Sequence, residues 1–509
     1  MSEKCYYVTT PIYYVNDMPH IGSAYTTIAA DVLARYHRLQ GRDVFFLTGT
    51  DEHGRKVERA AAERGETPLQ LADRVVRRYT ELLPKLEISN DDFIRTTQER
   101  HVRVVKRAFE KFRESGDLYL ADYEGWYCVS DENYLAEGDL LEDKRCPTCG
   151  KPAEWVKEPT YFFRLSKYQK RLLAFYEEYP KFISPESRRN EVIARVEQGL
   201  RDVSFTRTTI HWGVAMPWDS SHKSYVWVDA LLNYISAPGY SVDAERFGRI
   251  WPADVHLIGK DILWFHTVIW PAMLMSLRVE PPRRVFAHGW WTVNGQKMSK
   301  SAGNFVDPLV PIEKFGADAL RYFLMREVPF GLDGDYSDAA MVHRYNSDLG
   351  NDLGNLLYRT LNMIERYRGG VVPAAHSLDE AAGELRGAAV ALQNAVAAEL
   401  ADLQFSRALE RIWDVVRGAN RFVEQAKPWA LAKDAASAQA LDTVLYVLAE
   451  TLRIVSIHLN PFMPSTAASI QQELGMGEQP VRLSQAPWGG LPAGTRIAKG
   501  QPLFPRIDV

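Results

Sequence analysis

Cysteine is scarce in this chain of 509 residues, whose only cysteines are Cys5, Cys128, Cys146 and Cys149. Four cysteines are too few for the disulfide framework of a small secreted domain. Three of them lie close together along the chain, which is typical of a metal site in a protein from a reducing compartment.

A strong charge of one sign, long apolar runs and targeting signals are also missing. Lys and Arg total 61 and Asp and Glu total 65, so the formal net charge of -4 does not by itself indicate a nucleic-acid partner. Such a partner would require basic residues gathered on one face. No apolar run is long enough to span a bilayer, and the first residues lack a signal or transit peptide. We therefore expect a cytoplasmic protein without a membrane partner.

The first fifty residues predict a strand, a helix and a second strand. Residues 6–10 and 44–48 are rich in aromatic and β-branched residues, as buried strands are, and residues 23–40 carry an apolar stripe at helical spacing. This unit predicts a parallel, Rossmann-like sheet in an α/β fold. It contains neither GxGxxG nor GxxxxGK[ST], which disfavours ordinary dinucleotide binding and P-loop chemistry.

The rest of the chain predicts further domains, because 509 residues are too many for one core. Residues 116–221 break into short strands and turns and are interpreted as an insertion. Strands are expected again at 225–228, 256–258 and 284–289, and Asn294 with Gly295 predicts a tight turn. Beyond about residue 341, amphipathic helices predict an all-helical domain.

Two polar segments carry the chemistry. Residues 297–301 read Lys-Met-Ser-Lys-Ser, and two ammonium groups with two hydroxyls suit a loop that holds a polyanion. Residues 19–23 read Pro-His-Ile-Gly-Ser and open the first predicted helix, whose N–H groups favour phosphate. Taken alone, the first segment is common on protein surfaces, and His20 could be a turn histidine satisfied by local backbone. The occurrence of both in one chain favours a site for the phosphates of a nucleotide.

Together these segments resemble the HIGH and KMSKS signatures of the class I aminoacyl-tRNA synthetases, and almost the whole chain resembles the methionyl-tRNA synthetase family. The resemblance implies activation of L-methionine by ATP and Mg²⁺ to methionyl-adenylate, followed by transfer to the 3′-terminal adenosine of tRNA(Met). It implies that His20, Lys297 and Lys300 are catalytic. The implied ATP-binding residues are His20, Gly22, Ser23, Lys297, Ser299, Lys300 and Ser301. Ser23 departs from the family, which has a second histidine at this position.

Methionine recognition requires aromatic partners for a thioether and an anchor for an ammonium group. Candidate residues follow the predicted strands, whose carboxyl ends meet at one edge of a parallel sheet. The methionine-binding residues that the resemblance implies are Ile12, Tyr14, Asp51, Trp227, Ala230, Tyr234, Ile262, His266 and Trp270. Within this set Asp51 would hold the ammonium group. Taken singly, each aromatic residue could belong to the core, and Asp51 could be a helix N-cap.

The clustered cysteines predict a structural zinc site. Cys146 and Cys149 form a CxxC, and the upstream half supplies Cys128 and Asp131, with aspartate where the family usually has cysteine. Because a carboxylate can also ligate zinc, we expect Zn²⁺ held by Cys128, Asp131, Cys146 and Cys149. The alternative is a knuckle that has lost its metal. By resemblance this insertion is the connective peptide, and it is too short for an editing domain.

An anticodon is read by an aromatic platform together with planar hydrogen-bonding groups. Asn355 and Arg359 lie one turn apart on a predicted helix, and Trp429 follows a proline that begins another helix. These three residues match the anticodon-reading residues of the family. The alternative for Trp429 is a place in the core. We expect a monomer, because no dimerisation domain follows the helical region.

These expectations divide the chain into segments. The Rossmann catalytic domain comprises 1–115 and 223–280, the insertion with the zinc knuckle 116–222, the stem-contact region with the lysine loop 281–345, the anticodon-binding helices 346–484, and a tail that packs on a surface 485–509. Two alternatives stay open. One is a class I synthetase for cysteine, leucine or valine, and the other is an inactive paralogue that binds tRNA as a regulatory or assembly factor. Intact His20, Lys297 and Lys300 disfavour the paralogue.

Overall fold

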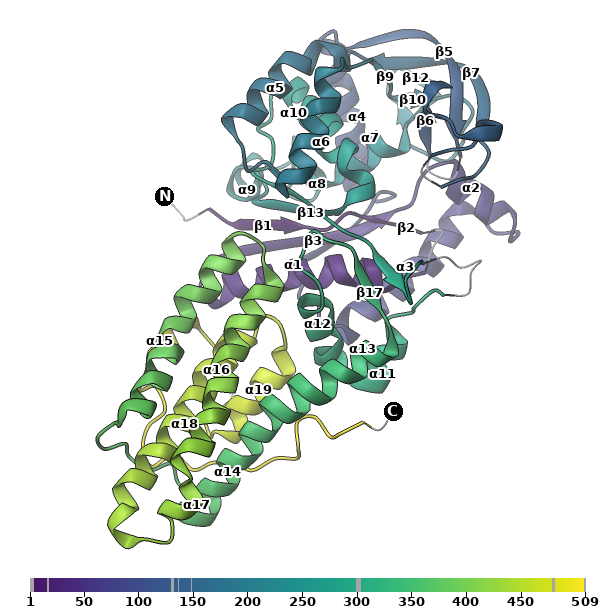
Figure 1. Cartoon of the computed structure of the whole chain (residues 1–509). Helices are drawn as coiled ribbons and strands as arrows, with labels where there is room; N and C mark the ends of the chain where they lie inside the picture. Colours follow the sequence, from purple (N-terminus) through teal and green to yellow (C-terminus); the bar gives the residue numbers. More distant parts are fainter. Residues whose placement is uncertain are drawn as a thin grey trace. The chain divides into compact units, whose positions relative to one another are not determined.

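The computed structural model of the chain describes residues 4–15, 18–129, 132–135, 137–147, 149–298, 304–477 and 481–507 (Figure 1). Its contacts divide the chain into two compact units. Unit 1 comprises Met1–Pro19, Val44–Leu82 and Asn90–His288. Unit 2 comprises His20–Asp43, Leu83–Ser89 and Gly289–Val509.

A parallel sheet organises unit 1, which confirms the predicted α/β fold. Within the described residues its strand order is β4-β3-β1-β13-β14-β8, and β2 pairs with the last two residues of β3. Every pair in it is parallel. The chain order reverses between β1 and β13, and in such sheets ligands bind beside the carboxyl ends of the strands at this point. The strands span Tyr6–Thr9 (β1), Tyr13–Tyr14 (β2), Val44–Asp51 (β3), Asp92–Arg95 (β4), Ile183–Ser184 (β8), Val255–Gly259 (β13) and Val285–His288 (β14).

The strands of this sheet are almost wholly buried. Val8, Phe46 and Leu257 have no exposed surface, as expected for strands of a parallel sheet covered on both faces. Helices of unit 1 pack with them into one hydrophobic core. The helices that lie in or begin in unit 1 span Arg55–Ala62 (α2), Pro68–Lys85 (α3), Glu99–Glu114 (α4), Gln169–Glu178 (α5), Glu186–Glu197 (α6), Val226–Leu231 (α7), Asn233–Ser236 (α8), Ala244–Ile250 (α9) and Trp270–Leu277 (α10).

The strand predicted at residues 225–228 is wrong. Tyr225 is the extended N-cap of helix α7, whose residues Val226, Val228 and Leu231 are buried. A short buried apolar run does not distinguish a helix from a strand, and here the run is helical. Trp227 therefore lies on a helix and not at the end of a strand.

The stretch interpreted as an insertion contains strands, as predicted, and they pair antiparallel. Their orders are β6-β5-β7-β9 and β10-β12-β11 within the described chain. The same stretch also contains α5 and α6 and contributes β8 to the main sheet, so it is not wholly separate from the Rossmann-like core. These strands span Leu118–Cys128 (β5), Asn133–Leu135 (β6), Glu154–Phe163 (β7), Val203–Ser204 (β9), Thr206–Arg207 (β10), Ala215–Met216 (β11) and Asp219–Ser224 (β12).

Unit 2 begins with a long helix and a small sheet. Helix α1 spans Ile21–Leu39, and a buried ion pair of 2.8 Å joins its Asp31 to Arg321 of α12. Asn294 and Gly295 have φ values of 51° and 76° and form the predicted tight turn between β15 and β16. The elements of this region span Trp291–Val293 (β15), Gln296–Lys297 (β16), Gly334–Tyr336 (β17), Leu309–Phe315 (α11), Ala317–Arg326 (α12) and Asp338–Arg344 (α13).

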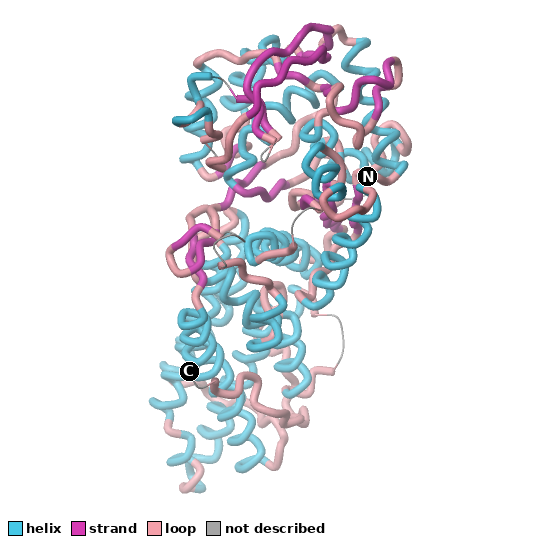
Figure 2. The backbone as a smooth tube through the Cα atoms, turned by 90° about the vertical axis from the view of Figure 1, so that its right-hand side faces the viewer, coloured by secondary structure: helices cyan, strands magenta, loops and turns pink. Residues whose placement is uncertain are grey.

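The rest of unit 2 is helical, as predicted (Figure 2, cyan). The apolar stripes are buried, including Leu361 of α14, Leu409 of α16 and Leu448 of α18. Glu450 of α18 accepts hydrogen bonds from the N–H groups of Gly489, Gly490 and Leu491, which fastens the C-terminal tail to this helix. The helices span Asn355–Arg368 (α14), Glu380–Ala401 (α15), Phe405–Ala426 (α16), Pro428–Leu431 (α17), Ala438–Leu459 (α18) and Pro464–Glu473 (α19).

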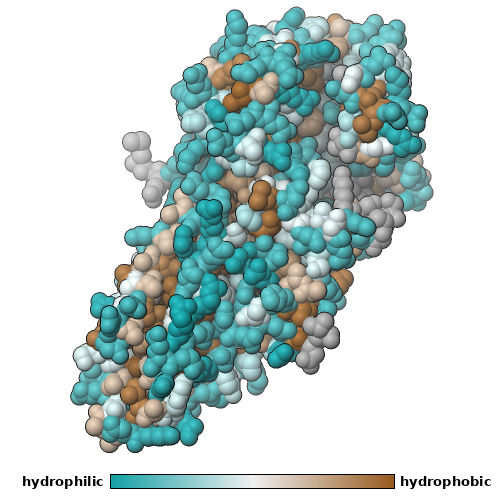
Figure 3. Space-filling view, viewed as in Figure 1, coloured by the Kyte–Doolittle hydropathy of each residue, from teal (hydrophilic) through white to brown (hydrophobic). Residues whose placement is uncertain are grey.

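Hydrophilic residues cover most of the face that Figure 3 shows. None of the described helices combines the length and the apolar character that a membrane crossing requires.

Candidate functional site

The N-terminus of α1 is built by the predicted signature segment. His20 is the N-cap, and its Nδ1 accepts a hydrogen bond of 3.0 Å from the N–H of Gly22. Ser23 completes a capping box, because its Oγ accepts from the N–H of His20 at 3.0 Å and donates to its carbonyl at 2.7 Å. A Cβ at position 22 would lie 2.8 Å from the His20 ring, so glycine is required there for this arrangement. The serine that departs from the family pattern thus has a structural role.

The described flanks of the lysine loop contact this helix start, and all of these residues lie in unit 2. The N–H of Ile21 donates to the carbonyl of Val306 at 3.2 Å. The rings of His20 and Phe305 are 5.9 Å apart, and a Cβ at Gly22 would lie 3.9 Å from the Met298 methyl group. The two signature segments, far apart in the sequence, therefore converge.

Part of the predicted phosphate site lies outside what the structure describes. The backbone of Lys297 pairs with that of Thr292 in the β15–β16 hairpin. Ser299, Lys300 and Ser301 lie outside the described residues.

Asp51 is the final residue of β3 and has 2% of its surface exposed. Its Oδ1 has no hydrogen-bond partner among the described residues. Burial, together with the carboxylates of Asp229 and Glu132, holds the pKa of Asp51 well above its ordinary value. The N-cap of α2 is Gly54, so the alternative that Asp51 caps this helix is wrong. A buried carboxylate oxygen without a partner is suited to accept hydrogen bonds from a cationic ligand.

The aromatic residues predicted to contact methionine touch one another in unit 1. Trp227 stacks on Phe265 at 4.1 Å and meets the edge of Tyr14 at 6.2 Å. The hydroxyl of Tyr234 lies 2.8 Å from Nε2 of His266.

The predicted methionine-binding residues differ in burial. Asp51, Ala230, Tyr234, His266 and Trp270 are buried. Ile12, Tyr14, Trp227 and Ile262 are partly buried and pack against the same core. Contacts join several of the predicted residues within unit 1: Tyr14 meets Trp227, and Tyr234 meets His266 and Trp270.

Sequence reasoning missed the buried acid Asp229, which lies on α7. Its Oδ2 is 2.7 Å from Nδ1 of His53, and its Oδ1 is 3.1 Å from Nε2 of His101. Burial opposes ionisation, but the two histidines hold the pKa of Asp229 well below its ordinary value. The carboxylate of Asp229 is thus a fixed negative charge that helps to raise the pKa of Asp51.

Glu132 was also missed, although it directly follows the predicted zinc ligand Asp131. Its carboxylate accepts from the hydroxyl of Tyr14 at 3.0 Å and from the N–H of Lys56 at 3.1 Å. The carboxylate is buried, and burial raises its pKa. The sequence held one signal, an acid that follows a strand ending in a cysteine, but no spacing rule connects it to Tyr14.

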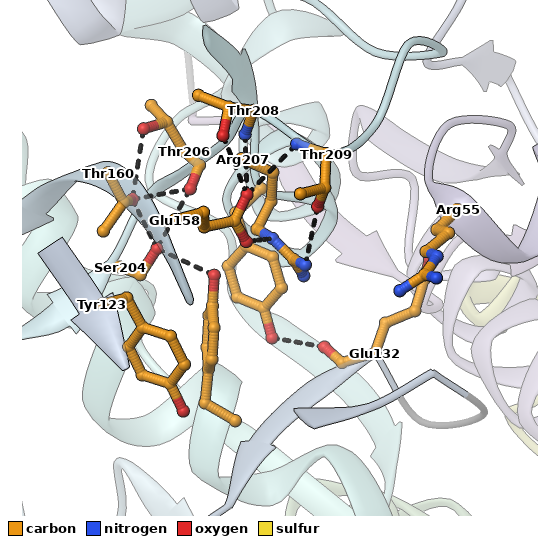
Figure 4. Close-up of polar contacts among 12 residues, drawn as sticks. Arg55, Tyr123, Glu132, Glu158, Thr160, Ser204, Thr206, Arg207, Thr208 and Thr209 are labelled. Carbon is orange, nitrogen blue, oxygen red and sulfur yellow. Dashed lines mark hydrogen bonds and ion pairs between the residues drawn. The ribbon is translucent and has the colours of Figure 1, made fainter. Parts of the chain in front are cut away.

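Arg207 lies on strand β10 and is buried, and Figure 4 shows its polar contacts. Arg207 pairs with Glu158, whose other oxygen accepts from the N–H groups of Thr208 and Thr209 at 2.9 and 3.1 Å. The guanidinium carbon lies 4.1 Å from the centre of the Tyr127 ring. Nη1 of Arg207 has no partner in the part of the chain that the structure describes.

The three clustered cysteines converge. The Sγ atoms of Cys128, Cys146 and Cys149 all lie within 4.8 Å of one another, and those of Cys128 and Cys149 are 3.5 Å apart. Sulfur atoms about 3.8 Å apart are expected around a tetrahedral zinc ion with Zn–S bonds of about 2.3 Å. The thiols therefore fit a zinc site, and the predicted fourth ligand, Asp131, lies outside the described residues.

The predicted anticodon residues lie on the helices of unit 2. Arg359 of α14 pairs with Glu424 at 2.7 Å, and its guanidinium carbon is 5.8 Å from the centre of the Trp429 ring. Asn355 is exposed on the same helix. Trp429 has 39% of its surface exposed, which excludes a place in the core.

The parallel sheet and the convergence of the two signature segments agree with the class I aminoacyl-tRNA synthetases that the sequence resembles. The model of the family described as "tRNA synthetases class I (M)" matches residues 6–151 and 136–361. The methionine–tRNA ligase of Caldanaerobacter subterraneus subsp. tengcongensis is 50% identical over 508 residues, which cover 100% of this chain and 80% of that protein. The methionine–tRNA ligase of Thermotoga maritima is 47% identical over 506 residues, which cover 99% of this chain and 80% of that protein.

Solved structures agree with these matches. Mycobacterium tuberculosis methionyl-tRNA synthetase in complex with methionyl-adenylate has a TM-score of 0.97 and 45% identity, covering 99% of this chain and 100% of the other. Its apo form has a TM-score of 0.90 and 42% identity, covering 99% of each chain. The chain belongs to the methionine–tRNA ligase family.

Proposed function

We propose that this protein activates L-methionine with ATP to methionyl-adenylate and transfers the methionyl group to the 3′-terminal adenosine of tRNA(Met). The observation that carries the proposal is the buried Oδ1 of Asp51, which has no hydrogen-bond partner among the described residues and lies in the same unit as the aromatic residues. Burial and the carboxylates of Asp229 and Glu132 raise the pKa of Asp51, so a cation beside it would favour its charged form. The α-ammonium group of an amino acid supplies one.

The side chain of methionine is recognised by the aromatic residues around Trp227. A thioether makes favourable contacts with aromatic rings, and it needs no charged partner. The proposed contacts are Ile12, Tyr14, Trp227, Ala230, Tyr234, Ile262, His266 and Trp270. Burial lowers the pKa of His266 to about 4, so this imidazole is neutral at physiological pH and does not introduce a charge beside the thioether.

The phosphates of ATP are held in unit 2 by the two signature segments. The carboxylate of methionine attacks the α-phosphorus and pyrophosphate leaves, so no strong base is required and the protein supplies position and positive charge. His20, Lys297 and Lys300 stabilise the charge that develops, and Gly22, Ser23, Ser299 and Ser301 complete the ATP site. Contacts of Phe305 and Val306 with the start of α1 support this arrangement. Mg²⁺ bound with ATP neutralises phosphate charge.

Cys128, Cys146 and Cys149, with Asp131 as the fourth ligand, would hold a structural Zn²⁺, which would brace the knuckle. Bound zinc supplies rigidity and no chemistry.

The tRNA anticodon is read by Asn355, Arg359 and Trp429. The pairing with Glu424 holds the guanidinium of Arg359 beside the exposed indole of Trp429, which presents a stacking surface next to a planar donor. The protein acts as a monomer in the cytoplasm.

Amino-acid-dependent exchange of pyrophosphate into ATP tests the proposal. Methionine should support exchange far better than cysteine, leucine or valine, and tRNA(Met) should then be charged. Exchange with another of these amino acids would assign the protein to a different class I specificity. Binding of tRNA without any exchange would instead indicate the inactive paralogue.

A further inference from the structure

A histidine outside the predicted site joins the first strand to two of the predicted methionine-binding residues. His256 lies on β13, directly beside Thr9 of β1 at the point where the strand order reverses, and neither residue has exposed surface. Its Nδ1 is 2.8 Å from Oγ1 of Thr9, and its Nε2 accepts from Nε1–H of Trp270 at 3.3 Å. The ring of Tyr234 stacks on the His256 ring, with centres 4.1 Å apart and planes inclined by 26°.

The protonation of His256 follows from these partners. An indole N–H can only donate, so Nε2 of His256 must carry a lone pair. Burial, reinforced by the nearby His266, holds the pKa of His256 well below its ordinary value, so the ring is neutral. The proton therefore resides on Nδ1, which donates to Thr9.

His266 holds the other end of the Tyr234 side chain. The carbonyl of Ile262 can only accept, so the Nδ1 of His266, 3.0 Å away, carries a proton. A neutral His266 then accepts at Nε2, and the hydroxyl of Tyr234 donates to it. Tyr234 is thus held by a ring against its face and by an acceptor at its hydroxyl.

We propose that His256 is a positioning residue for methionine recognition, which sets the places of Tyr234 and Trp270 by stacking on one and accepting a hydrogen bond from the other. This inference rests on the proposed function, because it concerns the same methionine-binding residues. The side chains that face His256 are Thr9, Tyr234, Trp270 and Trp251, with His266 as the nearby titratable group. None of these side chains carries a charge at neutral pH. None of them can therefore form a salt bridge with His256 in place of the hydrogen bond that Trp270 donates to its Nε2.

Three variants separate the contacts of His256. His256→Asn keeps a polar group near the position of Nδ1 and leaves the N–H of Trp270 without an acceptor. His256→Gln reaches the position of Nε2 and preserves that acceptor, although the stacked ring is lost. Thr9→Val removes only the hydroxyl that receives the Nδ1 proton and conserves the shape of the side chain.

His222 provides a matched control in the same unit. It is a buried histidine whose Nδ1 lies 2.9 Å from Oγ1 of Thr206 and whose ring meets the edge of Tyr161 at 4.8 Å. Among the residues that the structure describes, His222 has no hydrogen bond, ion pair or ring contact with a predicted methionine-binding residue. His222→Asn therefore reports the cost of removing a buried histidine from a threonine and a tyrosine elsewhere in this unit.

Pyrophosphate exchange and quenching of tryptophan fluorescence by methionine measure the effect. The KM and the dissociation constant for methionine should rise about tenfold in His256→Asn, because a buried donor is left unpaired. They should rise about threefold in His256→Gln and Thr9→Val, while kcat and the KM for ATP stay within about twofold. His222→Asn should leave the methionine constants unchanged.

The inference is overturned if the His256 variants lower the melting temperature but bind methionine as the wild type does. It is equally overturned if His222→Asn weakens methionine binding as much as His256→Asn. A wild-type protein that shows no methionine-dependent exchange contradicts the proposed function itself, which distinguishes the two failures.

Discussion

Asp51 is a buried acid whose charged form is disfavoured in the protein without a ligand. Its carboxyl is buried beside Glu132 and Asp229, and these neighbours disfavour its charged form. Because its pKa is raised in the folded protein, the folded state binds the Asp51 proton more tightly than the unfolded state does. Asp51 therefore destabilises the fold as the pH rises above the ordinary range for aspartate.

The first prediction concerns Asp51→Asn. The variant should lose about 10- to 150-fold in kcat/KM for methionine, because a hydrogen bond to a charged group contributes about 1.5–3 kcal/mol. Without methionine its apparent melting temperature at pH 7 should exceed that of the wild type by about 2 °C, because asparagine lacks the ionisation that burial and two neighbouring carboxylates disfavour in the folded protein. Exchange kinetics and thermal unfolding check both parts, and a variant that keeps normal methionine kinetics contradicts the role of Asp51.

The pH dependence of the wild type gives the second prediction. The free carboxylate is the form that accepts an ammonium group, and the pKa of Asp51 lies above its ordinary value of 3.8. The kcat/KM for methionine should therefore fall as the pH decreases through this raised pKa and level off above it. Initial exchange rates at low methionine concentration across the acidic range measure the profile. An acidic limb at the ordinary pKa of aspartate would show that the environment of Asp51 does not act on the reaction.

At the scale of single elements, the start of α1 combines two tasks in one histidine. His20 satisfies the N–H of Gly22 as an N-cap and is also a proposed catalytic residue. Asparagine is among the best N-cap residues but has no imidazole. The two tasks can therefore be separated by one substitution.

The third prediction is that His20→Asn keeps the stability of the protein and lowers kcat for methionine activation. The expected loss is about 100-fold, a typical effect of removing one group that stabilises developing charge. Circular dichroism and exchange kinetics measure the two effects. Loss of stability together with activity would indicate that capping alone explains His20.

The zinc knuckle is the other element whose role can be tested directly. Three thiols converge in a segment that has only a small cluster of buried apolar residues among the described ones, so a bound metal ion would add to its rigidity. The fourth prediction is about one equivalent of zinc in protein purified without chelators, and a marked loss of zinc in Cys146→Ser. Elemental analysis measures both, and protein without zinc would contradict the site.

At the scale of the whole molecule, the chemistry is divided between two compact units. The proposed methionine-binding residues lie in unit 1, whereas His20–Ser23, the lysine loop and the proposed anticodon residues lie in unit 2. Adenylate formation does not require tRNA, whereas charging requires both the adenylate and the tRNA. A substitution of a proposed anticodon residue should therefore impair tRNA charging and leave pyrophosphate exchange unchanged.

The fifth prediction is that Trp429→Ala impairs charging of tRNA(Met) by about 10- to 100-fold in kcat/KM, because base stacking on an aromatic side chain contributes about 1–3 kcal/mol. Methionine-dependent pyrophosphate exchange and the melting temperature should not change, because 39% of the indole surface is exposed. Arg366 and Tyr367 form another pair of a cation and an aromatic ring on α14, so Tyr367→Ala is a suitable control. Equal losses in both assays would indicate a role in packing.

The sequence by itself determined the parallel sheet, the helical C-terminal part and the family. Each of these can be recognised from residues that are close together in the sequence: apolar runs for buried strands, apolar stripes at helical spacing for helices, and the two signature segments for the family. Local patterns failed where a short apolar run allowed two structures, as at residues 225–228, which form the N-cap and first turn of α7.

Only the tertiary structure decided the environment of the candidate site. Glu132 meets Tyr14 across 118 residues of sequence, and His256 meets Thr9 across 247. No periodicity or spacing records such contacts, because they arise only when the fold brings together segments that are far apart in the sequence. Burial and neighbouring charges then decide which carboxyl group keeps its proton, and these properties belong to the folded protein and not to the sequence of any one segment.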